Sequence, residues 1–90
     1  MEEILIIREE DFWEKEEALQ HIAEALFFPA DYGMNLDALY DCLCDLGEDT
    51  NLALVPAEPT EDWFEDLMDT VVDASTENEH IHLFQKWDRD

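Results

Sequence analysis

Positive charge is almost missing from this chain of 90 residues. It contains only 4 Lys or Arg against 26 Asp or Glu, which gives a formal net charge of −22 at pH 7. Such a chain repels polyanions, so we expect neither DNA or RNA nor an anionic membrane as a direct partner. A partner that binds through charge must be strongly basic. Adaptation to high salt is an alternative origin of the acidity, and it does not exclude an acidic binding face.

The chain also lacks a long apolar run. Ile4 to Ile7 is too short for a signal peptide or a membrane span, and Met1-Glu2-Glu3 is acidic where a signal peptide is basic. Cys42 and Cys44 would point nearly opposite ways on a helix, so they cannot easily bond each other or share a metal. Reduced thiols suit a reducing compartment, and we expect a soluble cytoplasmic protein.

The residue patterns of an enzyme are missing as well. With 2 Gly and 3 His in the whole chain, there is no Gly-rich phosphate loop and no recognisable nucleophile motif. His80 and His82 would lie on one face of a strand, but no fixed third ligand accompanies them, and we interpret the pair as incidental. We expect no catalysis, no cofactor and no metal.

What is present is enough hydrophobic material for one folded domain. Hydrophobic residues make up 47% of the chain, with 3 Trp, 2 Tyr and 5 Phe, which is too rich for a disordered acidic tail. No linker or repeat divides the sequence, so residues 1–90 are expected to form a single domain.

Apolar segments of strand length alternate with amphipathic segments of helix length. Strands separated by helices are expected to be parallel and joined by right-handed crossovers. The predicted fold class is therefore α/β, with a small three-stranded parallel sheet packed with about three to four helices. The expected strands are Ile4 to Ile7, covered on both faces, Asn51 to Val55, and Ile81 to Phe84.

Capping residues indicate where the first and third helices begin. Asp11, followed by Glu14, is expected to cap a helix that ends before Pro29. Thr60 is expected to cap the third helix. The inner face of that helix is predicted to consist of Phe64, Leu67, Met68, Val71 and Val72.

The second helix carries the most informative pattern. Asn35 is a suitable N-cap, and Gly47 is expected to cap a helix that continues to about Leu46. At 100° per residue, Leu36, Leu39, Tyr40 and Leu43 form the buried stripe, with Tyr40 at its edge. Asp37, Asp41 and Asp45 form a row on one exposed flank. Like charges one turn apart cost a few tenths of a kcal/mol, so a basic partner would relieve this row. A merely solvated helix face is the alternative.

The segment that opens this helix closely resembles the signature of the barstar family of small ribonuclease inhibitors. The matching residues are Pro29, Tyr32, Gly33, Asn35-Leu36-Asp37-Ala38-Leu39 and Asp41-Cys42-Leu43. The departures are Asp31, where the family has an aromatic residue, and Tyr40, where it has Trp. Family members often carry two helices between the second and third strands, whereas Pro56 to Glu79 here holds one clear helix.

The resemblance implies an inhibitor that blocks the active site of a ribonuclease. Asp41 would be the central anchor in place of the substrate phosphate, with Asp37 as a supporting carboxylate. Gly33 and Asn35 would hold the binding loop. The remaining expected contacts are Asp31, Tyr32, Tyr40, Asp45 and Asp73. The family's namesake complex is itself an established example of hot-spot binding and electrostatic steering.

The expected partner is a basic ribonuclease or a similar basic toxin protein, bound one to one by a monomer that acts as an antitoxin. The extra carboxylate at Asp31 suggests a partner with more positive charge. An acidic nucleic-acid mimic, or another binding module for a basic non-nuclease protein, remains the alternative function. A mimic would present long carboxylate rows on several elements.

Overall fold

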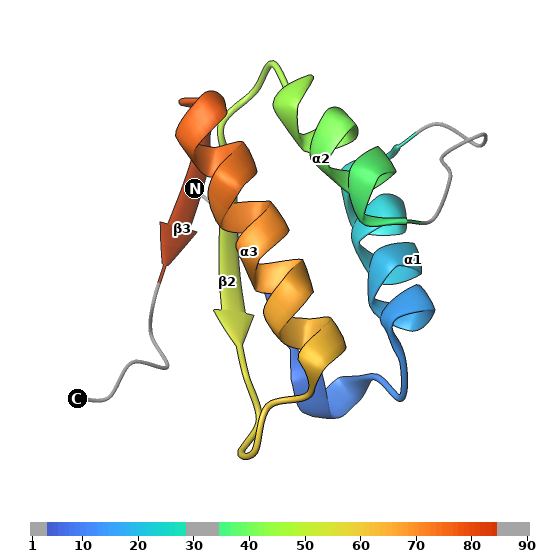
Figure 1. The fold of residues 1–90 in the computed structure, drawn as a ribbon. Helices are drawn as coiled ribbons and strands as arrows, with labels where there is room; N and C mark the ends of the chain where they lie inside the picture. The colour runs from blue at the N-terminus through green and yellow to red at the C-terminus, as the bar shows by residue number, and fades with distance from the viewer. Residues whose placement is uncertain (1–3, 29–34, 85–90) are drawn as a thin grey trace.

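The computed structural model describes residues 4–28 and 35–84, which form one parallel sheet and the helices that pack on it (Figure 1). In chain order the elements are β1 (Ile4–Arg8), a short 3₁₀ helix η1 (Glu9–Asp11), α1 (Lys15–Leu26), α2 (Leu36–Cys44), β2 (Thr50–Val55), α3 (Asp62–Glu77) and β3 (Ile81–Phe84). The expected α/β class, with a three-stranded parallel sheet, is confirmed.

The sheet has the order β1-β2-β3, with both pairs parallel. Leu5, Leu52 and Leu83 lie in one register row on the face that packs against the helices. The opposite face is more open, because Ile4 and Ile6 are 41% and 46% exposed. The prediction that the first strand is covered on both faces was therefore wrong: β1 is an edge strand whose inward side alone is buried.

The core lies between this sheet and the helices. Along α3 the buried residues are Phe64, Leu67, Val71 and Ala74, which recur at helical spacing. Val72 was predicted to lie on this inner face, but it is 43% exposed. Ala74, which was not predicted there, is buried. The reason is that α3 lies beside α2 (Figure 1), and its apolar stripe is turned toward both α2 and the sheet.

The helix starts differ from the expected ones at two places. Asp11 lies in η1, and α1 begins four residues later with Glu14 in extended conformation as its N-cap. Thr60 does not cap α3 either: Glu61 is the N-cap, and the Thr60 hydroxyl instead donates to the Ala57 carbonyl at 2.6 Å. Both predictions relied on local capping patterns that longer-range contacts override.

One such contact is made by Glu9, a buried carboxylate just after β1. Its Oε1 accepts a hydrogen bond from the Ala57 amide, and its Oε2 accepts one from the Glu61 amide, both at 2.8 Å. The carboxylate therefore satisfies backbone donors in the β2–α3 connection and at the N-terminus of α3, where negative charge is favoured. This single side chain ties the end of β1 to the start of α3.

Removing this carboxylate should destabilise the fold measurably. In Glu9→Ala, two amide donors in a part-buried connection lose their acceptors, and we expect the free energy of unfolding to fall by about 1–3 kcal/mol. Urea denaturation of the variant and of Glu10→Ala, which removes an exposed neighbouring carboxylate, provides the comparison. Equal midpoints for the two variants would show that the Glu9 contacts do not stabilise the protein.

Candidate functional site

The helix α2 presents the predicted acidic row to solvent. Asn35 caps it as expected, because its Oδ1 accepts a hydrogen bond from the Ala38 amide at 2.8 Å. Leu39 and Leu43 are fully buried, and this orients the helix. As a result, the side chains of Asp37, Asp41 and Asp45 all lie exposed on the outer flank.

Tyr40 lies half-buried between this flank and α3. The pKa of its hydroxyl is raised, first by hydrogen bonding to Cys44, then by partial burial, and to a smaller extent by electrostatic interaction with Cys44, Glu77 and Asp73. The carboxylates of Glu77 and Asp73, both on α3, thus contribute to the raised pKa of the Tyr40 hydroxyl on α2. The structure thus brings Asp73, expected from sequence only through a loose family alignment, toward the edge of the acidic flank.

Glu77 belongs to the same acidic surface and was not predicted. It follows Asp73 by one helical turn on α3, so the two side chains lie on the same side of that helix. This i, i+4 spacing is a signal that sequence reasoning could have used. The surface formed by Asp37, Tyr40, Asp41, Asp73 and Glu77 is called the acidic face below.

The remaining expected contacts have different outcomes. Asp31, Tyr32 and Gly33 lie outside the described residues, so their predicted role in the binding loop stays a prediction. Asp45 is described, and it stands just past the last residue of α2, as its C-cap in helical conformation.

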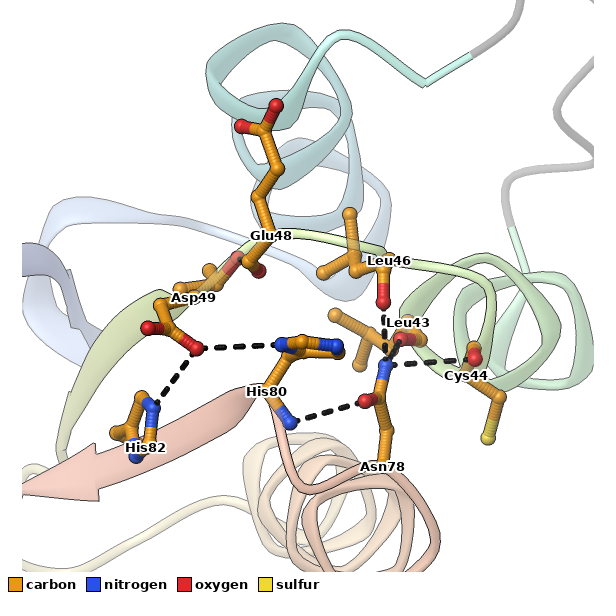
Figure 2. Close-up of polar contacts among 9 residues, drawn as sticks. Leu43, Cys44, Leu46, Glu48, Asp49, Asn78, His80 and His82 are labelled. Atoms are coloured by element: carbon orange, nitrogen blue, oxygen red, sulfur yellow. Dashed lines mark hydrogen bonds and ion pairs between the residues drawn. The ribbon is translucent and has the colours of Figure 1, made fainter.

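The end of α2 is held by a side chain from a distant part of the chain, Asn78 (Figure 2). Its Nδ2 donates to the carbonyls of Leu43 and Leu46, both at 2.9 Å, and more weakly to that of Cys44 at 3.3 Å. Its Oδ1 accepts from the His80 amide at 3.0 Å. Gly47 is therefore not the helix cap that the sequence predicted, because the terminal carbonyls already have a donor.

A second polar cluster lies next to this contact, where Asp49 meets two histidines (Figure 2). Its Oδ1 lies 3.2 Å from His80 Nδ1 and 3.4 Å from His82 Nε2. The hydrogen bond from His80, followed by that from His82, lowers the pKa of the Asp49 carboxyl. Within residues 4–28 and 35–84, no group of three His, Cys, Asp or Glu side chains is placed to hold a metal ion.

Fold and surface together define a class of protein: a small parallel α/β domain with an acidic helical face. In the part of the chain that the structure describes, no helix combines the length and apolarity needed to cross a membrane.

Comparison with known families then identifies the group within that class. The family model for Barstar (barnase inhibitor) matches residues 3–86, and the chain belongs to this family. Members of the family are inhibitors, and its name implies a ribonuclease of the barnase type as the partner class. A search of curated proteins finds no match.

The Asp49 cluster makes the stability of the fold depend on pH in a definite direction. Because the pKa of Asp49 is lowered in the folded protein, its contribution is present above the ordinary value of 3.8 and is lost as the pH falls through the lowered value. Asp49→Asn should therefore be less stable than the native protein at pH 6, and the difference should disappear toward pH 2.

Urea titrations of the native protein and the variant at several pH values measure this difference. Subtracting the free energy of unfolding of the variant from that of the native protein at each pH cancels the contribution of the many other carboxylates, which both proteins share. Glu48→Gln, which neutralises an exposed neighbour, serves as the control. A stability difference that does not change between pH 6 and pH 2 would contradict the assignment.

Proposed function

We propose that this protein is an intracellular inhibitor of a basic ribonuclease, of the antitoxin or immunity type, that blocks the enzyme's active site with its acidic face. The observation that carries the proposal is the presentation of Asp37 and Asp41. They lie one turn apart on the exposed side of α2, in a chain that belongs to the Barstar (barnase inhibitor) family. The proposed complex contains one copy of each protein.

The chemistry of a ribonuclease explains why carboxylates can inhibit it. Such an enzyme gathers Arg, Lys and His side chains around the scissile phosphate to stabilise the charge that develops there. A carboxylate placed among these groups accepts charge-assisted hydrogen bonds, bidentate in the case of Arg. Asp41 is the proposed anchor at the phosphate position, and Asp37 supports it from one turn earlier.

The neighbouring groups would widen this contact. Tyr40 is half-buried at the side of α2 that packs against the core, so part of its ring stays open to a partner. Asp73 and Glu77 add carboxylates on the α3 side. The loop residues Asp31, Tyr32 and Gly33 complete the proposed surface.

Two structural features support placing the site on α2. Buried leucines and the Asn78 contacts hold the helix at its inner side and at its C-terminal end, so its exposed flank is a preorganised surface. Preorganisation reduces the entropy lost on association. In addition, no Lys or Arg among the described residues forms a salt bridge with Asp37 or Asp41. Both carboxylates can therefore accept hydrogen bonds from a basic partner.

Inhibition should depend on Asp41 far more than on carboxylates elsewhere. RNA cleavage by barnase, and by a panel of small basic microbial ribonucleases, is titrated with the native protein and with Asp41→Ala. We expect stoichiometric inhibition by the native protein, and a loss of about 2 kcal/mol or more in the variant, roughly 30-fold in Kd.

Asp11→Ala is the matched control, because it removes the same charged group from η1, away from α2. It should inhibit as the native protein does. If Asp41→Ala inhibits as well as the native protein does, the inhibitor function stands, but the binding site does not depend on Asp41 and lies elsewhere. A folded native protein that inhibits none of these enzymes would contradict the proposal and favour a nucleic-acid mimic or a module for another basic protein.

Association should also be strongly dependent on salt. The net charge of −22 attracts a basic partner over distances that ionic strength screens. Stopped-flow measurements should show an association rate constant that falls by about tenfold or more between roughly 50 mM and 500 mM salt, with a smaller change in the dissociation rate. An association rate that is independent of salt would argue against binding through the acidic face.

A further inference from the structure

Phe27 is an unusual residue at the C-terminal end of α1. It adopts a left-handed backbone conformation with φ of 60°, and it is the one non-glycine residue with positive φ within residues 4–28 and 35–84. This conformation costs a non-glycine residue roughly 1–2 kcal/mol. Helices that end in this way usually place Gly or Asn at the position, so the choice of Phe is not explained by the cap.

The Phe27 ring also gains little from the fold, because the residue is 91% exposed. An aromatic side chain kept in water on a strained backbone points to a role in binding, since such strain persists at functional sites. Aromatic residues are also enriched in protein interfaces relative to the rest of the surface.

Beside Phe27 lies an open cleft with a volume of about 950 Å³. Its apolar wall comes from the end of α1 and the start of β1, and its other wall is the connection between α2 and β2, residues 45–49, together with the first two residues of β2. The apolar side chains in the lining include Ile4, Leu5, Leu26, Phe27 and Leu46. The cleft thus combines an apolar wall with the exposed aromatic ring of Phe27.

Carboxylates form the rim of this cleft. Asp45, Glu48 and Asp49 all line it, and Figure 2 shows the Glu48 side chain extending from the connection toward α1. Asp49 is engaged by His80 and His82, whereas Asp45 and Glu48 have no Lys or Arg partner among the described residues. Long basic side chains fit this combination, because their methylene stems pack on apolar surface while the charged end stays at the rim.

We propose that the cleft receives a basic surface segment of the same ribonuclease that the acidic face binds, with an Arg or Lys side chain against the Phe27 ring and its charge at Asp45 and Glu48. The assignment rests on the proposed function. Charge complementarity selects a basic occupant, and a cation against an aromatic face is attracted to it. Asp45 follows Asp41 by one helical turn, so the cleft continues the surface of α2 toward α1.

The variant Phe27→Gly separates binding from folding. Gly adopts positive φ readily, so removing the ring should leave the urea midpoint unchanged or raise it. If the ring contacts the partner, affinity should fall about tenfold, as for an aromatic contact residue in an interface. Isothermal titration with barnase, or with whichever ribonuclease of the panel is inhibited, measures this change. Phe27→Asn, which also tolerates positive φ, should give the same result.

The matched control is Trp13→Ala, which removes an equally exposed ring, also 91% exposed, near the opposite end of α1. Its affinity should stay within about twofold of the native value, as expected for a ring outside the interface.

Glu48→Lys tests the rim: reversal of this charge should weaken binding more than Glu24→Lys, which reverses a charge on α1 outside the cleft lining.

The outcomes distinguish this inference from the proposed function. Unchanged affinity in Phe27→Gly and Phe27→Asn, with binding lost in Asp41→Ala, would overturn the cleft and leave the inhibitor function standing. A lower urea midpoint in both Phe27 variants, with unchanged affinity, would show that the ring is structural and would also overturn the inference. If the native protein binds none of the ribonucleases, the proposed function fails, and the assignment of the cleft to that partner fails with it.

Discussion

The position of the acidic helix depends on one buried amide, Asn78. The last carbonyls of a helix need donors from outside it, and a left-handed glycine with its own backbone amides is the usual local solution. Here the Asn78 side chain donates to the carbonyls of Leu43 and Leu46, while its own carbonyl accepts from the His80 amide. The same side chain therefore ends α2, shapes the turn before β3 and fixes how α2 lies beside α3. The contact thereby helps to set how the carboxylates of α2 lie relative to those of α3, the helix that Asn78 ends.

The scarcity of basic residues explains the kind of polar contact that holds the fold together. Where another protein would use Lys or Arg, the described part of this chain uses backbone amides and side-chain amides. The Glu9 carboxylate accepts from two backbone amides, Asn35 caps α2, and Asn78 closes it. The short contacts between a carboxylate and a basic side chain among the described residues involve His80 and His82 rather than Lys or Arg. Since these internal contacts require few carboxylates, most of the negative charge remains on the surface, where it can attract a basic partner.

Predictions from local sequence patterns were confirmed where a helix depends only on its own residues. They were wrong where a side chain distant in the sequence binds the backbone at a helix end. The inward leucines of α2, its Asn35 cap and its outward aspartates follow from helical periodicity alone, and the structure has them so. Asp11 and Thr60 are equally good caps by composition. They do not cap their helices, because the chain around them is held by η1 and by the Glu9 contacts to the β2–α3 connection. Gly47 is not used as a cap for a similar reason.

The sequence by itself therefore determined the α/β class, the parallel sheet expected from alternating elements, and the face of α2 that carries Asp37 and Asp41. These properties depend on periodicities of a few residues and on net charge, which need no knowledge of distant neighbours. Only the tertiary structure decided that Glu77 lies near Tyr40 and that the exposed ring of Phe27 borders an acidic cleft. Both arrangements arise where elements far apart in the sequence pack together, and the pairing of such elements is set by the whole core rather than by any segment of it.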